Sequence, residues 1–201
     1  MKIICFYNNY PPVSNTFPEI KHPLFYLKPD TSILTNNRPF FIPEFTEEIH
    51  CQLELVIRMD KLGKYIDKKF AFSYFHEIAL GVNIFDKKTQ DTCIQKGVPW
   101  ECSTVFENSA AISPFYPIET IKDINSLSVK LMKNNTELCN GNTASMIYSI
   151  DNLIAHISKY FTIKTGDLIF TGSPFPSIPL AINDVLEVFL ENKKCLKLRI
   201  K

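Results

Sequence analysis

The chain has 201 residues, of which 45% are hydrophobic and 21% charged, and its formal net charge is +1. A chain of this length can bury a substantial core without disulfides or structural metals. The nearly neutral charge gives no electrostatic basis for binding nucleic acid or an anionic membrane surface. We therefore expect a single domain over residues 1–201, with neither of those partners.

The cysteines give a second constraint. The six residues form no Cys-x-x-Cys pair and show no framework spacing, which is typical of reduced thiols in a reducing compartment. No apolar run approaches the length of a membrane span, and the apolar run near the N-terminus is too short for a signal peptide. These features predict a soluble, cytoplasmic protein.

Short apolar runs bounded by proline, asparagine and glycine predict a chain dominated by strands. In the first half we expect strands over residues 2–7, 24–29 and 51–59, an irregular loop over residues 8–23, and a hairpin turn at residues 61–64. Residues 72–85 are almost wholly apolar and are compatible with strand or helix. Residues 87–97 have a helical composition that ends at Gly97, a residue suited to a helix C-cap.

The second half of the chain again predicts short strands separated by turns, with one helix. Residues 126–138 predict two strands around a turn at Asn134 and Asn135. Apolar residues at three- and four-residue spacing then predict a helix that begins near Thr143 and includes Met146 and Ile150. Residues 166–174, 184–192 and 195–201 complete a strand-rich ending. The fold class expected is α+β with strands dominant.

The stretch "HCQLELVI" begins as a strand whose alternate side chains suit metal binding. Gln52 and Glu54 project from one face, because successive side chains on a strand point to opposite sides, and Cys51 faces the other way. His50 is interpreted as a strand or rim residue, since a solitary histidine lacks the other ligands of a metal site.

Several motifs, in order, resemble the fumarylacetoacetate hydrolase family. "FYLKPDT" resembles the family's F-L-K-P-x-T, "HCQLELVI" its H-x-E-L-E-L-x-V, and "TQDTCIQKGVPW" its Q-D-x-x-x-K-G-x-P-W. Near the C-terminus, "GNTASM" and "GDLIFTGSP" match G-N-T-x-x-M and G-D-x-I-x-T-G-T-P. The ordered set covers nearly the whole chain, so the chain is identified as a member of this family.

The resemblance implies a mixed β-roll with flanking helices, assembled as a homodimer, with Mg²⁺ or Mn²⁺ in a cleft. It further implies metal-dependent hydrolysis, isomerisation or decarboxylation of small oxo acids or related dicarboxylates. In such chemistry a divalent cation polarises the 2-oxo and carboxylate oxygens of the substrate and stabilises the developing enolate.

The family's three metal-binding carboxylates fall on Gln52, Glu54 and Asn83. The formal charge of the ligand set therefore changes from −3 to −1. Mg²⁺ prefers hard oxygen ligands, and carboxylates also neutralise its charge. Since each lost charge is worth several kcal/mol of attraction in a partly buried cleft, we expect a weak or empty site.

Two further catalytic positions differ from the family pattern. The family's lysine falls on Thr104, and its water-activating histidine falls on Val13. His22, with Glu19 as a partner, is an alternative in the same proline-rich loop. No residue is therefore assigned a catalytic role. The motif "TGTP-x-GVG" reads "TGSPFPSI" here, so two glycines become Pro176 and Ile178.

Six positions remain as substrate-binding candidates implied by the resemblance: Lys28, Gln90, Cys139, Thr171, Gly172 and Ser173. Cys139 replaces a family glutamine and is the one thiol considered as a nucleophile, although inert packing is the simpler interpretation.

Two hypotheses follow from the sequence. The first is a divergent scaffold that has lost its metal-dependent chemistry and binds a small acid or a partner. The second is an active acylpyruvate hydrolase or isomerase that uses Glu54, Gln52 and Asn83 around a weakly held ion. We favour the first, because several independent chemical roles are replaced together.

Overall fold

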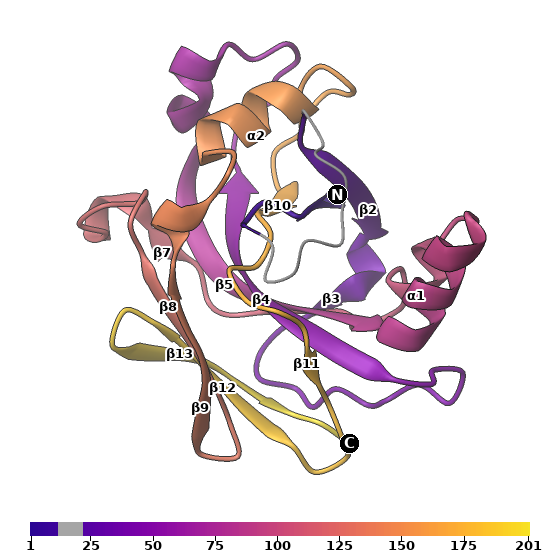
Figure 1. Ribbon diagram of the computed structural model, residues 1–201. Coiled ribbons are helices and arrows are strands. Elements are labelled where there is room, and N and C mark those ends of the chain that lie inside the picture. The colour runs from indigo at the N-terminus through magenta and orange to yellow at the C-terminus, as the bar shows by residue number, and fades with distance from the viewer. Residues whose placement is uncertain (12–21) are drawn as a thin grey trace.

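The computed structural model describes residues 1–11 and 22–201. Thirteen strands and two α-helices are present in the described residues, together with short 3₁₀ turns (Figure 1). The expected fold class, α+β with strands dominant, is confirmed. The strands are β1 (Lys2–Tyr7), β2 (Leu24–Pro29), β3 (Ile33–Leu34), β4 (Ile49–Met59), β5 (Phe75–Asp86), β6 (Ala110–Ile112), β7 (Tyr116–Pro117), β8 (Ser128–Lys133), β9 (Thr136–Asn142), β10 (Leu168–Phe170), β11 (Ile178–Pro179), β12 (Val185–Leu190) and β13 (Lys193–Arg199).

The larger sheet has the order β2-β1-β10-β4-β5-β6-β3, with β11 paired to β4 and β7 paired to β5. Its centre is the long antiparallel pair β4 and β5, in which Gln52 lies opposite Asn83 and Glu54 opposite Gly81. β1 and β10 are parallel neighbours, although they are more than 160 residues apart in sequence. The segments that follow these two strands therefore leave the sheet at the same edge.

The smaller sheet has the order β13-β12-β8-β9 and is antiparallel throughout. The strands β8 and β9 join at Asn134 and Asn135, both of which have positive φ, as the expected turn requires. In Figure 1 this sheet lies below the larger one.

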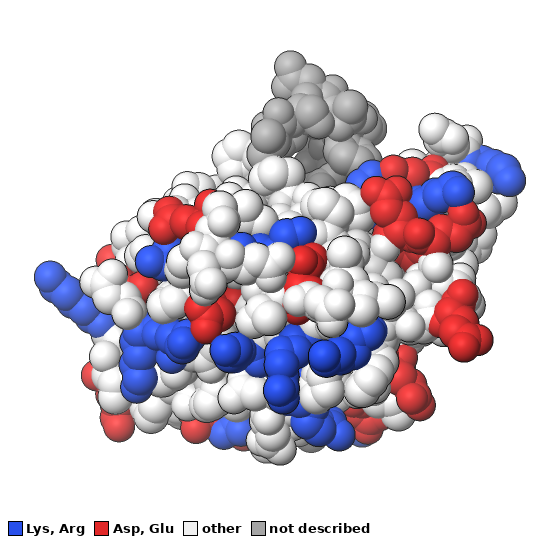
Figure 2. All heavy atoms as spheres, turned by 90° about the horizontal axis from the view of Figure 1, so that it is seen from below, with Lys and Arg blue, Asp and Glu red and all other residues white. Residues whose placement is uncertain are grey.

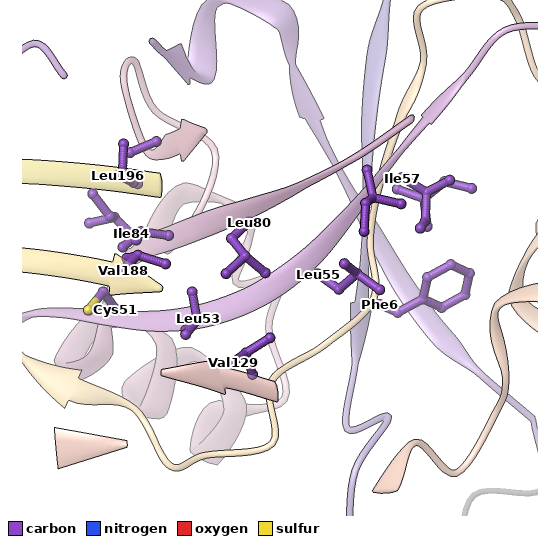
Figure 3. Packing of buried hydrophobic residues seen from close by; sticks show 14 of the residues in the cluster. Phe6, Cys51, Leu53, Leu55, Ile57, Leu80, Ile84, Val129, Val188 and Leu196 are labelled. Carbon is purple, nitrogen blue, oxygen red and sulfur yellow. The ribbon is translucent and has the colours of Figure 1, made fainter. Parts of the chain in front are cut away.

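The main core fills the space between the two sheets. The odd-numbered residues of β4 point into it, among them Cys51, Leu53 and Leu55, where they meet Val188 and Leu196 of the smaller sheet (Figure 3). Hydrophobic residues on the opposite face of the larger sheet form a second, smaller cluster. Most of β4 is therefore buried on both faces, with the polar residues Gln52 and Glu54 on the face opposite the main core.

Two α-helices flank the sheets. Helix α1 (Lys87–Lys96) follows β5 directly, is capped at its start by the Asp86 carboxylate and ends at Gly97 in the left-handed conformation, as expected. Helix α2 (Ile150–Ile157) starts later than predicted. Residues Thr143–Ser145 form a 3₁₀ turn instead, capped by the Asn142 side chain. The Ile147 and Tyr148 N–H groups then donate to the Asn9 carbonyl and to Asn9 Oδ1, which keeps them out of a continuous helix.

The hairpin turn predicted at residues 61–64 is replaced by a longer connection. Strands β4 and β5 do form an antiparallel pair, but the connection runs over residues 60–74 and includes a 3₁₀ segment, Lys68–Tyr74. Within this connection, Gly63 pairs with Ile163 on another part of the chain, so its backbone bonds there and not across a short hairpin turn. The ambiguous residues 72–85 prove to be the end of this 3₁₀ segment followed by β5.

The surface around the smaller sheet mixes charges of both signs. Figure 2 views this end of the molecule and shows Lys and Arg side chains in a row, with Asp and Glu side chains nearby. On the edge strand β13, Lys194 and Lys197 both pair with Glu187 of β12. Charged residues on an edge strand disfavour pairing with another sheet. Within residues 1–11 and 22–201, we find no helix with the length and apolar character needed to cross a membrane.

Gly81 lies where the second cluster allows no side chain. A Cβ atom at this position would approach Phe170 to 2.4 Å and Val56 to 2.7 Å. We expect Gly81→Ala to lower the free energy of unfolding by about 1–3 kcal/mol, because an extra methyl group in a close-packed core displaces its neighbours. Urea denaturation measures this loss. Gly97→Asn is the control and should cost less, because position 97 has open space and asparagine tolerates the left-handed conformation.

Candidate ligand pocket and its buried carboxylate

A pocket of about 590 Å³ opens on the face of β4 and β5 that carries Gln52 and Glu54. Its walls come from the segment after β1, from Asn83 and Phe85 of β5, from one side of α1, and from residues 172–177 after β10. The predicted alternation along β4 is correct, since Gln52 and Glu54 line this pocket while Cys51 is buried in the main core.

The parallel pairing of β1 and β10 brings two of these walls together. Asn9, just beyond β1, donates from Nδ2 to the Thr171 carbonyl at 2.9 Å and to the Tyr148 carbonyl at 3.0 Å. Its Oδ1 accepts from the Tyr148 N–H at 2.8 Å. One buried amide thus holds the segment after β1, the segment after β10 and the approach to α2 in a fixed arrangement.

Glu54 is the only acidic residue among the buried side chains at the base of this described pocket, and it is 2% exposed. Its Oε1 accepts from Asn83 Nδ2 at 2.7 Å, and its Oε2 accepts from the Gly172 N–H at 2.7 Å. Gly172 has φ of +90°, and a Cβ there would lie 3.0 Å from Asn9 Cβ. Glycine is therefore required where the backbone turns its N–H towards the carboxylate.

Burial dominates the proton affinity of this carboxyl group. Desolvation raises the pKa of Glu54 from its ordinary value of 4.5 to about 7, although the bonds from Asn83 and Gly172 and the charge of Lys28 act in the opposite direction. At neutral pH the group is therefore divided between its neutral and charged forms.

Asn83 leaves one polar atom unsatisfied. Its Nδ2 donates to Glu54 and, at 2.8 Å, to the Tyr26 hydroxyl. No donor in the described part of the chain reaches its Oδ1, although that atom is buried. A buried acceptor without a partner costs free energy, so this atom is suited to a water molecule or a ligand with a hydrogen-bond donor.

The donor set does not fit the divalent-metal site that the sequence resemblance implies. Among the described residues, no three His, Cys, Asp or Glu side chains gather closely enough to hold a metal ion. Both oxygens of Glu54 already accept hydrogen bonds, and the amide nitrogen of Asn83, rather than its oxygen, faces the carboxylate. These contacts satisfy the carboxylate without a cation.

Lys28 lies beneath the pocket and does not line it. Its ammonium donates to the Ile84 carbonyl at 3.0 Å, to the Ser109 carbonyl at 2.9 Å and to Ser109 Oγ at 3.0 Å. Burial lowers the pKa of Lys28 to about 8, while the negative charge of Glu54 acts in the opposite direction. The side chain is held by the Ile84 carbonyl of β5 and by Ser109, below the residues that line the pocket.

The other predicted ligand-binding residues divide into two groups. Gln90 of α1, Gly172 and Ser173 line the pocket. Thr171 is buried, and its hydroxyl donates to the Leu55 carbonyl at 3.1 Å. Cys139 is on β9 and packs in the main core, where burial raises the pKa of its thiol to about 11. Its strand belongs to the smaller sheet, which sequence order alone does not reveal.

The two described residues linked to the replaced catalytic roles, Thr104 and His22, lie away from the pocket. Thr104 is fully buried, and its hydroxyl donates to the Glu101 carbonyl at 3.2 Å. His22 stacks on His156 and lines a separate hollow beside α2. Val13 and Glu19 lie outside the described residues.

Sequence reasoning missed several residues of the pocket wall. Lys87 and Asp91 form an ion pair on α1 and line the pocket together, and Tyr26 lines it from β2. The four-residue spacing of Lys87 and Asp91 on a predicted helix could have indicated the ion pair, but not that it lies at the pocket. Ser177 also lines the pocket and contacts His50, and no local pattern links those two residues.

The sequence model for the C-terminal region of fumarylacetoacetate (FAA) hydrolases matches residues 2–201. Together with the two-sheet fold and the pocket on β4 and β5, this match places the chain in the fumarylacetoacetate hydrolase family. The resemblance seen in the sequence motifs is thereby confirmed.

Two oxaloacetate tautomerases and one solved structure are similar to this chain over most of its length. The mitochondrial oxaloacetate tautomerase FAHD1 of Mus musculus is 31% identical over 182 residues, which are 90% of this chain and 82% of the relative. The oxaloacetate tautomerase YcgM of Escherichia coli is 29% identical over 192 residues, 93% of this chain and 87% of the relative. The fold matches that of fumarylpyruvate hydrolase from Pseudomonas aeruginosa, whose crystal structure contains Mn²⁺ and pyruvate, with a TM-score of 0.92 and 23% sequence identity. The match covers 100% of this chain and 89% of the hydrolase chain.

The raised pKa of Glu54 predicts a stability that falls as pH rises. The folded state binds this proton more tightly than the unfolded chain, so the contribution is fully present below pH 4.5 and is lost as pH passes through about 7. Relative to Glu54→Gln, which cannot titrate, the wild-type free energy of unfolding should fall by about 3 kcal/mol across this window. Urea denaturation of both proteins in a metal chelator measures it. A pH-independent difference would contradict the assignment.

Proposed function

We propose that this chain is a divergent family member that binds a small 2-oxo acid in the Glu54 pocket, with the metal-dependent turnover of the family lost or much reduced. The observation that carries this proposal is the engagement of both Glu54 oxygens by Asn83 Nδ2 and the Gly172 N–H. The carboxylate is satisfied by the protein itself, and amides occupy the positions of the other two implied ligands.

The chemistry of the pocket wall supports binding of a small polar acid. The Gln90 amide, the Ser173 hydroxyl and the Lys87 ammonium supply hydrogen-bond donors for carboxylate and oxo oxygens. Phe85 and Phe175 supply apolar surface to the same pocket. A few polar groups on an apolar wall are typical of small-molecule sites. The relatives named for oxaloacetate and the neighbour crystallised with pyruvate support the same substrate class.

A second candidate function is an active oxo-acid hydrolase, isomerase or tautomerase with a weakly held Mg²⁺ or Mn²⁺. The unpartnered Oδ1 of Asn83 favours it, because this atom is a hard oxygen beside the Glu54 carboxylate. Rotation of the Asn83 amide would direct that oxygen towards Glu54, but it would also remove the present bond to the carboxylate. We rank this function second because the ion must replace contacts already made.

The two candidates differ in their response to added charge. We expect the Kd of the unmodified protein for Mg²⁺ or Mn²⁺ to be above about 1 mM, where a Kd of about 1 mM corresponds to a binding free energy of about −4 kcal/mol. Gln52→Glu combined with Asn83→Asp should tighten binding at least tenfold, because the formal charge of the three positions changes from −1 to −3. Calorimetry measures both affinities, and oxaloacetate tautomerisation and acylpyruvate cleavage are assayed in parallel.

The control is Gln95→Glu, which adds one negative charge on the α1 side of the pocket, where the double substitution adds two at its base. It should raise metal affinity much less than the double substitution. Micromolar Mg²⁺ affinity of the unmodified protein, or turnover at an enzyme's usual rate, would favour the second candidate. Failure of the double substitution to improve affinity would contradict the alignment of the three positions.

We also propose that two copies assemble as a homodimer. Support comes from apolar side chains exposed on the connection between β4 and β5, where Leu62 is 68%, Tyr65 72% and Phe70 56% exposed. Sedimentation equilibrium at micromolar concentration should give twice the mass of the chain. Tyr65→Glu with Phe70→Glu should give a monomer, whereas Ile182→Glu, which alters an exposed residue elsewhere, should not. A monomer mass for the unmodified protein contradicts the proposal.

A further inference from the structure

A serine, a histidine and a carboxylate form a hydrogen-bonded chain at the edge of the pocket. Ser177 Oγ lies 3.0 Å from His50 Nδ1, and His50 Nε2 lies 2.9 Å from Glu48 Oε1. In the tautomer with its proton on Nε2, the histidine donates to Glu48 and accepts from the Ser177 hydroxyl. Both contacts are then satisfied, and the lone pair of Nδ1 faces the serine proton.

The sheet register brings this chain of contacts to the pocket. β11 pairs with β4 so that Ile178 lies opposite Cys51 and Pro179 opposite His50. Continuing this register by one residue sets Ser177 opposite Gln52, and both residues line the pocket. The His50 side chain is only 12% exposed, and the Phe85 ring lies 6.3 Å from its ring. The contact with Ser177 is thus shielded, while the serine itself faces the cavity.

We propose that Ser177 is a nucleophile for acyl transfer from small activated esters, with His50 as its general base and Glu48 as the residue that positions His50. The inference rests on the two hydrogen bonds and on the opening of Ser177 to the pocket. These are the relations that a nucleophile, its base and the base's orienting group require. It goes beyond the proposed binding of oxo acids and does not depend on it.

The Gln52 amide completes the arrangement. An attacked carbonyl develops negative charge on its oxygen, and a hydrogen-bond donor beside the nucleophile stabilises that charge. Gln52 offers an N–H donor across the strand pair from Ser177, whereas a glutamate there would repel the oxyanion. Gln52 and Ser177, two of the positions at which this chain differs from the family motifs, therefore suit one another chemically.

The reaction balances without a cofactor. Ser177 Oγ forms a bond to the acyl carbon while its proton passes to His50 Nδ1, and the ester C–O bond then breaks as the leaving alkoxide takes that proton. Water attacks the acyl-serine, gives one proton to His50, and the proton returns to Ser177 as the acid leaves. The net change is ester and water to acid and alcohol.

Covalent labelling tests the nucleophile directly. The full-length protein is treated with an alkyl fluorophosphonate, which phosphonylates an activated serine with loss of fluoride, and the modified residue is located by peptide mass spectrometry. We expect label on Ser177, none on that peptide in Ser177→Ala, and a rate at least tenfold lower in His50→Gln. Hydrolysis of p-nitrophenyl acetate should fall in the same order.

Further variants separate chemistry from folding. Glu48→Leu should slow labelling, and Glu48→Gln should restore part of the rate, because its amide oxygen still accepts from Nε2. Gln52→Glu should slow labelling with the Ser177 and His50 contact intact. Ser126→Ala, at an exposed serine outside the pocket, should label at the wild-type rate. Circular dichroism establishes that each variant is folded.

The result that overturns the proposal is a folded wild-type protein with no label on Ser177, or one whose labelling rate is unchanged in His50→Gln. Because the probe contains no oxo acid, a failure here leaves the Glu54 proposal standing. Normal Ser177 labelling in a protein that does not bind an oxo acid would contradict the Glu54 proposal and leave the Ser177 proposal standing.

Discussion

The buried carboxylate of Glu54 is the interaction around which the pocket is organised. Its two oxygens join β4 to β5 through Asn83 and to the segment after β10 through Gly172. A charge removed from water must be compensated, and here neutral donors supply part of that compensation, since burial still raises the pKa of Glu54 to about 7. The arrangement of the pocket wall and the protonation state of Glu54 therefore depend on the same three residues, Glu54, Asn83 and Gly172.

A second buried charge lies on the same side of the larger sheet. The Lys28 ammonium is bound by two carbonyls and by Ser109, without a direct carboxylate partner among the described residues. Its attraction to Glu54 is felt by both groups, since each alters the pKa of the other. Burial opposes ionisation of both groups, whereas their mutual attraction favours it. The Lys28 ammonium is thus a cation that the protein itself supplies below the pocket floor.

The changes at the family positions have different structural consequences. Asn83 keeps its place on β5 but presents its amide nitrogen to Glu54, so its oxygen is left for a water or a ligand. Thr104 is absorbed into a local turn and leaves the pocket without the lysine that the family pattern has there. At residues 172–177 the chain gains a serine that meets His50. A position that loses one chemical role can thus gain another, because neighbouring strands bring different side chains to it.

The sequence by itself determined the strand-rich class, the alternation along β4, the helix that ends at Gly97 and the turn at Asn134 and Asn135. These features depend on local periodicity and on the conformational preferences of single residues. The tertiary structure alone decided which candidates reach the pocket. Lys28 and Cys139 point elsewhere because their positions are set by backbone carbonyls and strand order distant in sequence. The helix expected near Thr143 begins at Ile150, and the distant residue Asn9 binds the Ile147 and Tyr148 N–H groups before it. The contact of Ser177 with His50 across 127 residues is of the same kind, since it exists only once β11 pairs with β4.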